Sequence, residues 1–381
     1  MLTDFIPTIF VFLHKVIILL KTPNKKSALS EIHGVTQPET LSTYVANQIQ
    51  QFRRKQPTGD ELITGILKGD KTALSRAITL VESTNPEHLA KANEVIKGCL
   101  PHANNSVRIG ITGVPGVGKS TFIEAFGKYL TSIGKKVAVL AVDPSSSISH
   151  GSILGDKTRM EELVKDENAY IRPSASGDTL GGVARKTRET IILCEACGFD
   201  TIIIETVGVG QSETAVHSMV DFFLLLKISG AGDELQGIKR GIMEMADTIV
   251  INKADGDNVA KAKLAKTEFN RALHLFPAKS SGWIPKVTTC SAYEKTGIDA
   301  IWEIISDYFE LVKSNHYFEE KRQNQNQFWM METINEQLKS HFYNHPNIMQ
   351  LLEENKKAVQ NNEISPFAAA MNLLKEYFNK E

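Results

Sequence analysis

The middle of the chain alternates short runs of β-forming residues with stretches of helical pattern. Several of the runs are apolar almost throughout, which is typical of parallel strands buried on both faces. The stretches between them carry apolar residues at helical spacing. Alternation of this kind predicts an α/β fold with a mainly parallel central sheet and right-handed crossovers. The runs expected to be strands are 107–112, 137–142, 201–206, 221–228, 247–252 and 286–291.

The segments on either side of this block are helical in pattern. Apolar residues recur at helical spacing between Asp60 and Leu100, and again from Met331 to Phe342, where they form a stripe suited to an interface or a core face. We therefore expect four parts along the chain. They are an N-terminal extension and linker (1–58), an N-terminal helical region (59–105), the α/β domain (106–312) and a C-terminal helical extension (313–381).

The first residues of the chain are apolar but short for a membrane span. Residues 5–20 are interrupted by Pro7, His14 and Lys15, whereas a spanning helix needs about 20 predominantly apolar residues. The favoured interpretation of this segment is an extension without a specific function or a docking helix. Weak membrane contact and a targeting segment are the less favoured alternatives. We expect no stable membrane insertion.

Composition narrows the class of protein. Lys and Arg number 43 against 44 Asp and Glu, so the net charge of −1 offers no broad basic surface for nucleic acid. Four cysteines in 381 residues cannot form a disulfide framework, which favours a reducing, cytoplasmic setting.

The most specific motif is a complete G-x-x-x-x-G-K-S between a predicted strand and a predicted helix, the context that a P-loop requires. Its glycines let main-chain N–H groups surround a phosphate, and the helix N-terminus adds a favourable dipole. Lys119 is expected to reach the β- and γ-phosphates, and Ser120 to ligate Mg²⁺. The expected nucleotide contacts here are Gly113, Val114, Pro115, Gly116, Val117, Gly118, Lys119, Ser120 and Thr121.

Two later motifs indicate guanine. Asn252-Lys253-Ala254-Asp255 closes an apolar strand, and the carboxylate of Asp255 can accept from both N1–H and the N2 amino group of guanine. Adenine offers neither donor and would leave that carboxylate unpaired. Ser291-Ala292, followed by Tyr293, ends the next predicted strand, where a main-chain N–H is expected to meet the base oxygen. In this order after a P-loop, the motifs predict a GTP and GDP site.

Acidic residues at other strand ends are candidates for the metal and for the attacking water. Glu205 begins E-T-V-G, so its carboxylate is expected to hold a magnesium-bound water while Gly208 senses the γ-phosphate. The alternative is a strand-end acid paired with a lysine. Asp143 and Asp156 follow the strand 137–142 and can reach the same edge of the sheet. Their alternatives are a helix cap and a solvated loop acid.

These motifs together resemble the MeaB family, the methylmalonyl-CoA mutase-associated GTPases, over about residues 60–312. The segments that carry the resemblance are GVPGVGKST, AVDPSSSISHGSILGDKTRM, RPSASGDTLGGVARKTRET, ETVGVGQSE, GAGDELQGIKRGI and NKAD, in this order. The resemblance implies a GTPase of the P-loop class that guards the loading of adenosylcobalamin into its mutase and helps eject inactivated cofactor. It implies no tightly held organic cofactor of the GTPase itself.

The resemblance also implies roles for individual residues. It places Lys119, Asp143, Asp156 and Glu205 in the catalytic and magnesium set, and Gly208 and Gln211 in a switch. The stretch 229–241 resembles an additional switch that couples nucleotide state to the mutase through Asp233, Gln236 and Lys239. The C-terminal extension resembles a dimerisation arm, which implies a homodimer that a cut after about residue 315 would turn into a monomer. The partner that the resemblance implies is methylmalonyl-CoA mutase or a related cobalamin-dependent acyl-CoA mutase.

Three other functions remain open at this stage. A metal-insertion GTPase of the nickel maturation type predicts a His-rich or Cys/His tract, whereas the 10 histidines here are scattered. An ATPase or kinase of lysine, arginine and ornithine transport is opposed by the guanine motif. A nucleotide-dependent scaffold without catalysis is opposed by the intact P-loop and acids. The lone C-x-x-C of Cys194 and Cys197 has no second Cys/His pair at matching spacing, so a redox or metal role is not expected. His150 and His217 are expected to have structural or solvated roles.

Overall fold

The computed structural model describes residues 57–142, 160–173, 180–206, 212–230 and 240–378. The chain divides between Gln56 and Pro57 into two compact units, and every described residue belongs to the second.

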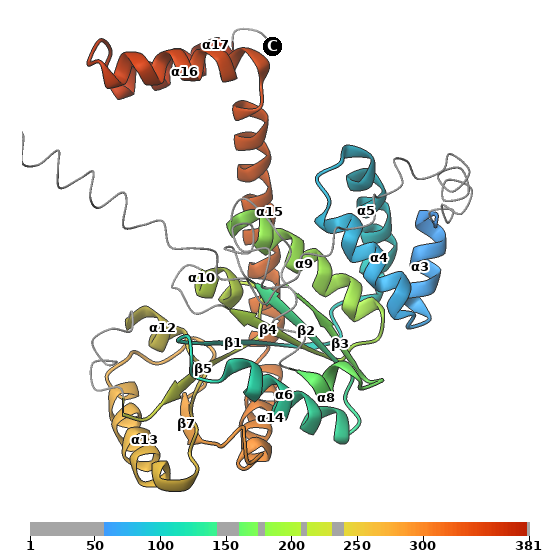
Figure 1. Ribbon diagram of the computed structural model, residues 1–381, viewed down its shortest axis with the longest axis vertical. Coiled ribbons are helices and arrows are strands. Elements are labelled where there is room, and N and C mark those ends of the chain that lie inside the picture. Colours follow the sequence, from blue (N-terminus) through green and yellow to red (C-terminus); the bar gives the residue numbers. More distant parts are fainter. Residues whose placement is uncertain (1–56, 143–159, 174–179, 207–211, 231–239, 379–381) are drawn as a thin grey trace, which may run out of the picture. The chain divides into compact units, whose positions relative to one another are not determined.

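A seven-stranded sheet forms the centre of this unit, and every pair of neighbouring strands is parallel (Figure 1). The strand order is β3-β2-β4-β1-β5-β6-β7, so β1 lies between β4 and β5. The strands are β1 (Val107–Gly113), β2 (Val137–Val142), β3 (Ala169–Arg172), β4 (Thr201–Thr206), β5 (Phe222–Ile228), β6 (Thr248–Asn252) and β7 (Lys286–Thr289). The predicted α/β class with a mainly parallel sheet is confirmed.

All six predicted strands are present, with small differences at their ends. β5 and β6 each begin one residue later than expected, because Asp221 and Asp247 cap the neighbouring main chain. The Arg108 N–H donates to Asp221 Oδ2 at 2.9 Å, and the Phe223 N–H donates to Asp247 Oδ2 at 2.9 Å. β7 ends at Thr289 rather than at residue 291. β3 was not predicted: it is a four-residue edge strand with mostly half-buried side chains, too short to show a period of two.

Helices flank the sheet and continue beyond it. The described helices are α3 (Gly59–Leu67), α4 (Lys71–Glu82), α5 (Pro86–Cys99), α6 (Lys119–Ser132), α8 (Glu161–Val164), α9 (Leu180–Ala196), α10 (Ser212–His217), α12 (Arg240–Met245), α13 (Val259–Leu273), α14 (Ile298–Ser314), α15 (Tyr317–Tyr343), α16 (Pro346–Gln360) and α17 (Pro366–Phe378). Short 3-10 turns are η1 (Leu100–His102) and η2 (Gly256–Asn258).

Each face of the sheet is covered by its own helices. On one face, Ile109 and Ile111 of β1 belong to a core with α6, α8 and α14. On the other face, α9, α10, α12 and α13 supply the buried apolar side chains. β1 carries Gly110 there, because a Cβ at that position would lie 2.8 Å from the Phe223 ring and 3.1 Å from Val216 of α10. The result is a three-layer helix–sheet–helix arrangement.

The helices before β1 pack on α9. α3, α4 and α5 contact one another, and α4 and α5 contact α9. α3 begins with a capping box, in which Thr58 Oγ1 accepts from the Glu61 N–H at 3.2 Å and the Glu61 carboxylate accepts from the Thr58 N–H at 2.8 Å. Reciprocal bonds of this kind satisfy donors that the start of a helix leaves unpaired.

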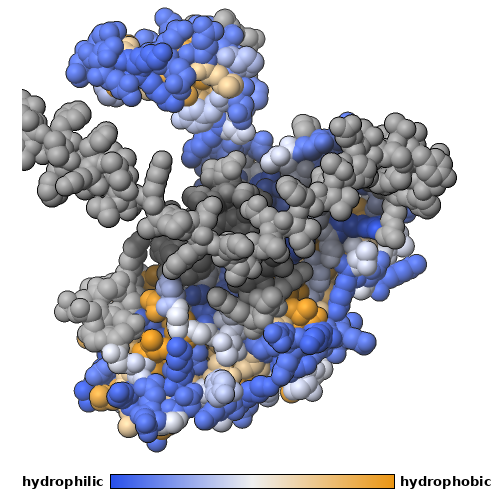
Figure 2. All heavy atoms as spheres, viewed as in Figure 1, coloured by the Kyte–Doolittle hydropathy of each residue, from blue (hydrophilic) through white to orange (hydrophobic). Residues whose placement is uncertain are grey.

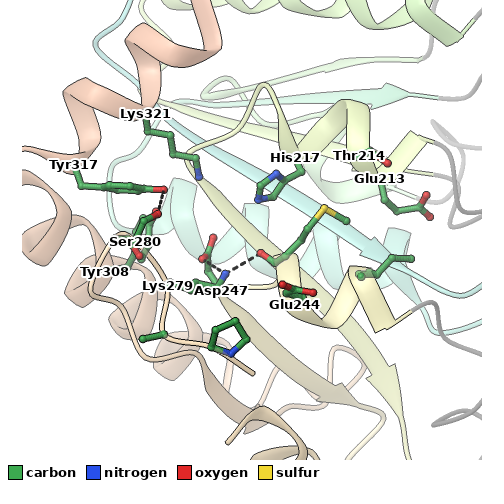
Figure 3. A pocket seen from close by; sticks show the side chains of 16 residues that line it. Glu213, Thr214, His217, Glu244, Asp247, Lys279, Ser280, Tyr308, Tyr317 and Lys321 are labelled. Atoms are coloured by element: carbon green, nitrogen blue, oxygen red, sulfur yellow. Dashed lines mark hydrogen bonds and ion pairs between the residues drawn. The ribbon is translucent and has the colours of Figure 1, made fainter. Parts of the chain in front are cut away.

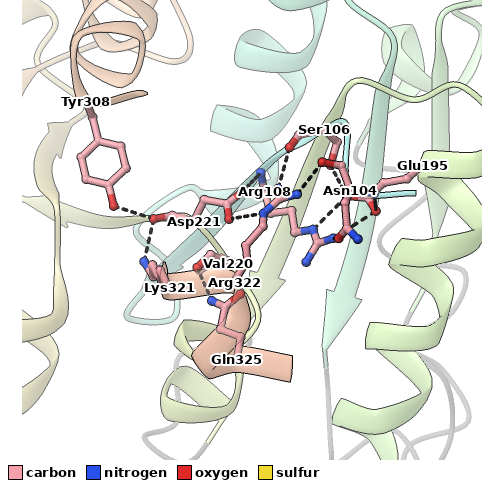
Figure 4. Close-up of polar contacts among 10 residues, drawn as sticks. All are labelled: Asn104, Ser106, Arg108, Glu195, Val220, Asp221, Tyr308, Lys321, Arg322 and Gln325. Carbon is pink, nitrogen blue, oxygen red and sulfur yellow. Dashed lines mark hydrogen bonds and ion pairs between the residues drawn. The ribbon is translucent and has the colours of Figure 1, made fainter. Parts of the chain in front are cut away.

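A buried polar cluster fastens α15 to the edge of the sheet at which the strands begin, called here the amino edge (Figure 4). Arg322 of α15 donates to both carboxylate oxygens of Asp221 and to the main-chain oxygens of Asn104 and Ser106. Arg108 of β1 forms a second buried pair, bidentate with Glu195 of α9. We call these six residues the amino-edge network.

Beyond this network the C-terminal helices expose apolar side chains. Trp329 is 7% exposed and belongs to the core, with its Nε1 donating to Ser218 O at 3.1 Å. The following turns expose Met331 at 52%, Ile334 at 44% and Leu338 at 60%. On the face shown in Figure 2, the surface of α16 and α17 is mostly hydrophilic. No helix in the described ranges combines the length and the hydropathy that a membrane crossing requires.

Candidate functional site

The P-loop connects β1 to α6 at the edge where the strands end, the carboxyl edge. Gly116 and Gly118 have φ of 82° and 91°, in the left-handed region that favours glycine. No described atom lies within 4 Å of a Cβ built at Gly116. A Cβ at Gly118 would lie 2.9 Å from Asn252 Nδ2, so a larger residue there would press on β6. Lys119 Nζ donates to Gly113 O at 2.9 Å, across the base of the loop.

The end of β6 is hydrogen-bonded to this loop. Asn252 Nδ2 donates to Val117 O at 2.9 Å, and Lys253 Nζ donates to Gly116 O at 2.9 Å. Asn252 is 1% exposed, and Lys253 holds a φ of 58°, which is uncommon for a residue with a side chain. The structure thus brings the N-K-A-D motif and the P-loop together.

The end of β7 completes the same group of residues. The Ser291 hydroxyl donates to the Asp255 carboxylate, and the Ala292 N–H donates to Asn252 Oδ1 at 3.1 Å. The Glu294 N–H donates back to Ser291 Oγ at 3.0 Å. Asp255 is half-buried and Tyr293 is 85% exposed. These bonds hold the Asp255 carboxylate at the rim of the P-loop, which is where an acid that reads guanine is expected to lie.

Sequence reasoning missed one residue of this group, Asn258. Its Nδ2 donates to Lys253 O at 2.6 Å, and its Oδ1 accepts from the Ser229 hydroxyl at 2.7 Å. It thereby joins the end of β6 to the residue that follows β5. The only signal in the sequence is an amide three residues after Asp255, which is too weak to identify it.

Glu205 lies at the same edge, near the end of β4. It pairs in register with Ile111 of β1 and Ala141 of β2, and it is half-buried. The next residue, Thr206, donates its hydroxyl to Thr112 Oγ1 at 2.8 Å, which ties β4 to β1 beside the P-loop. Ser120 is half-buried in the first turn of α6. A carboxylate and a hydroxyl are oxygen donors, the ligand type that Mg²⁺ prefers, so the donors described here fit that ion.

Several predicted site residues lie outside the described residues. They are Asp143, Asp156, Gly208, Gln211, Asp233, Gln236 and Lys239, together with His150.

The cysteine pair and His217 have the properties of buried structural groups. Cys194 and Cys197 are free and buried, and burial raises the pKa of the Cys197 thiol to about 11. Burial likewise lowers the pKa of His217 to about 4, so this imidazole is neutral at pH 7. Among the described residues, no group of three or more His, Cys, Asp or Glu side chains is arranged to hold a metal ion.

A family model and several known proteins are similar to this chain over most of its length. The family model described as methylmalonyl Co-A mutase-associated GTPase MeaB matches residues 74–347. GTPase ArgK of Escherichia coli (strain K12) is 47% identical over 306 residues, which are 80% of this chain and 92% of that protein. The mitochondrial methylmalonic aciduria type A homolog of Mus musculus is 47% identical over 328 residues, 84% of this chain and 79% of that protein.

A solved structure agrees with the fold over a similar span. The crystal structure of a protein described as LAO/AO transport system kinase has 40% sequence identity and a TM-score of 0.68. The alignment covers 85% of this chain and 99% of that chain.

Proposed function

The chain belongs to the MeaB family of methylmalonyl-CoA mutase-associated GTPases and is a GTPase, and from this premise we propose its cellular role. It is a GTP-hydrolysing chaperone that gates the loading of adenosylcobalamin into methylmalonyl-CoA mutase, and it protects or reactivates that enzyme. The relative from Mus musculus, whose name refers to methylmalonic aciduria, supports the link to this metabolism.

The observation that carries the proposed nucleotide chemistry is the pair of hydrogen bonds from β6 to the P-loop. Asn252 and Lys253 bond to Val117 O and Gly116 O, so the acid expected to read the base has a fixed position relative to the loop expected to hold the phosphates. A guanine whose N1–H and N2 amino group reach Asp255 therefore has its phosphates directed to residues 113–121. Pre-positioning of this kind lowers the ordering cost of binding.

The site supports a division of labour among its residues. The P-loop amides and Lys119 bind the phosphates, while Asp255, Ser291 and Ala292 select guanine. Ser120 and Glu205, with Asp143 and Asp156, would hold Mg²⁺, which would neutralise charge on the β- and γ-phosphates. Glu205 would also orient the attacking water.

We extend the proposal to the switch segments and the assembly. Gly208 and Gln211, and the segment with Asp233, Gln236 and Lys239, change arrangement with the nucleotide and report its state to the mutase. The exposed apolar side chains of α15–α17 hold a homodimer, because an unpartnered apolar stripe is costly in water.

The experiment that tests the role uses purified protein and methylmalonyl-CoA mutase. GTP hydrolysis is measured with and without the mutase, and complex formation is measured with GDP and with a non-hydrolysable GTP analogue. We expect the mutase to accelerate hydrolysis and the complex to depend on the nucleotide. Lys239→Ala should reduce the acceleration more than it weakens GTP binding, while Lys263→Ala, an exposed lysine on α13, should change neither. Hydrolysis that is indifferent to the mutase, with no complex in either nucleotide, would contradict the chaperone role.

An amino-acid transport kinase is the second candidate, favoured only by the description of the similar solved structure. Such an enzyme would use ATP, and Asp255 has no donor to meet on adenine. A competition experiment separates the two functions: ATP should fail to displace GDP at concentrations at which GTP displaces it fully. A metal-insertion GTPase has no specific observation in its favour.

A further inference from the structure

A cavity of about 590 Å³ lies beside the start of β6, at the amino edge and therefore away from the P-loop (Figure 3). Its walls come from α10, α12, the segment 277–281, α14 and α15. A second cavity of about 520 Å³ adjoins it and shares four of its lining residues. These four are His217, Ser280, Tyr317 and Lys321.

The shared residues are hydrogen-bond donors around a positive charge. Lys321 Nζ donates to Asp221 O at 2.7 Å, which uses one of its three N–H groups, and none of the ion pairs among the described residues includes it. Ser280 and Tyr317 present hydroxyls that lie 3.4 Å apart. His217 is a neutral imidazole with one N–H to give.

The acids nearby do not cancel this charge. Asp221 is paired with Arg322 at 2.7 Å, and Asp247 is paired with Lys279 at 2.6 Å. Glu244 and Glu320 are exposed. Glu213 is buried and its Oε2 has no hydrogen-bond partner among the described residues, but it lies across the cavity from Lys321, with His217 between them (Figure 3). The wall around Lys321 is therefore positive and rich in donors, as an anion-binding wall must be.

One part of the larger cavity wall is apolar, although Glu213, Thr214, Glu244, Asp247, Lys279 and Ser281 also line the cavity. Ile242 and Met245 of α12, Pro277 and Ala278 line it, together with the buried ring of Tyr308. From these observations we infer that the cavity binds a small organic anion. Its carboxylate or phosphate lies against Lys321, Ser280, Tyr317 and His217, and its apolar body lies against α12 and Pro277.

An occupant of this cavity would contact both helices that follow the proposed switches. α10 begins at Ser212, directly after residues 207–211, and α12 begins at Arg240, directly after 231–239. Binding therefore alters GTP turnover, an effect that rests on the proposed function of those segments. Because the cavity and the P-loop lie at opposite edges, the anion does not compete with GTP.

The probe is benzoate, with benzamide as the neutral compound of the same shape, and binding is measured by calorimetry on the full chain. We expect benzoate to bind at least about tenfold more tightly than benzamide, since the amide loses the charge-assisted bonds. Phenyl phosphate distinguishes a preference for phosphate from one for carboxylate. Lys321→Met should remove the preference for benzoate, whereas Lys263→Met, on α13 and outside both cavities, should keep it.

A second variant blocks the cavity without touching Lys321. Gly241 lines it, and no described atom lies within 4 Å of a Cβ built there, so a larger side chain fits at this part of the wall and Gly241→Leu is designed to fill the cavity. It should abolish benzoate binding, while Gly241→Ala should reduce it little. A folded Gly241→Leu protein that binds benzoate normally, or equal affinity of the wild type for benzoate and benzamide, would overturn the site.

Turnover is measured in the same samples. Benzoate binding that leaves kcat for GTP unchanged would overturn the coupling and leave the site standing. A protein that binds benzoate as expected but hydrolyses no GTP would instead contradict the proposed function, so the two failures are distinguishable.

Discussion

Arg322 of α15 and Asp221, the residue before β5, form a buried bidentate ion pair. Arg322 Nε lies 3.0 Å from Asp221 Oδ1, and Arg322 Nη2 lies 2.7 Å from Asp221 Oδ2. Their side chains are 9% and 1% exposed. Because Asp221 Oδ2 also accepts from the Arg108 N–H, one carboxylate joins α15, β5 and β1. α15 is thus anchored in the core of the α/β unit.

Loss of the Arg322 guanidinium should destabilise the whole unit. Arg322→Met keeps most of the side-chain volume but leaves Asp221 buried without its counter-charge, for which we expect a loss of about 3–5 kcal/mol in the free energy of unfolding. Denaturant titration measures it. Lys356→Met, which breaks an exposed pair on α16, serves as the control and should leave the unfolding midpoint unchanged. Equal midpoints for the two variants would contradict the anchoring role.

The same pair predicts how stability depends on acid. Burial alone would raise the pKa of Asp221, but the charge and hydrogen bonds of Arg322 outweigh it and lower this pKa below its ordinary value. A carboxyl whose folded pKa is depressed stabilises the fold fully above its unfolded pKa, about 3.9, and loses that contribution as pH falls through the folded value. Between pH 6 and pH 3 the stability advantage of the wild type over Asp221→Asn should therefore shrink. If the advantage of the wild type grows on acidification, the pKa of Asp221 is raised on folding and not lowered.

Asp255→Asn should change the base that the site prefers. The amide can donate to the 2-oxo group of xanthine but cannot accept both donors of guanine, so we expect GTP to bind about 10- to 100-fold more weakly and XTP more tightly. Calorimetry with both nucleotides measures the exchange. Ser291→Ala, which removes only the hydroxyl that donates to Asp255, should weaken GTP binding less and leave XTP a poor ligand.

Substitution of Lys119 should affect GTP binding, whereas substitution of Glu205 should affect GTP turnover. Lys119 is expected to contact the phosphates in the ground state and the transition state alike, so Lys119→Ala should nearly abolish GTP binding. Glu205→Ala should chiefly lower kcat, because its proposed role is through magnesium or the attacking water. Single-turnover hydrolysis at saturating GTP distinguishes these outcomes, and an unchanged kcat in Glu205→Ala would remove that residue from the chemistry.

The structure changes the design of the dimer test. A cut after about residue 315 would remove Arg322 and Trp329, which belong to the core, and would test folding rather than assembly. Ile334→Glu with Leu338→Glu instead charges the exposed stripe of α15 in an intact chain. We expect this protein to be monomeric by light scattering and to bind GTP normally. A dimer of wild-type stability would place the interface elsewhere.

Sequence reasoning located the elements and motifs that are local. Six of the seven strands were recognisable as runs of β-forming residues, and several of these are apolar almost throughout, since a strand buried on both faces needs no neighbour to reveal it. The P-loop and N-K-A-D are contiguous motifs, so their position at strand ends followed from the order of elements along the chain. The structure agrees on this placement.

Features built from distant residues were not predictable in the same way. Asn252 and Val117 are 135 residues apart, and nothing local to either indicates their hydrogen bond. Arg108, Glu195, Asp221 and Arg322 each have the appearance of a surface charge in the sequence, where charged residues are normally exposed. Only the parallel arrangement of β1 and β5 and the path of α15 bring them together. β3 was missed because four residues carry too little pattern.

The location of the amino-edge network has a consequence for protein engineering. α15 is rooted where the strands begin, and the nucleotide motifs lie where they end, so the full length of the strands separates the two. From that root α15 runs along α9 toward its N-terminus, since Arg188 donates to Asn326 and a Cβ at Gly181 would meet the Glu336 carboxylate. A fluorophore or an affinity handle that should stay clear of the phosphate-binding loop therefore belongs on an exposed residue at the root of α15, such as Glu319, rather than at the end of the C-terminal helices.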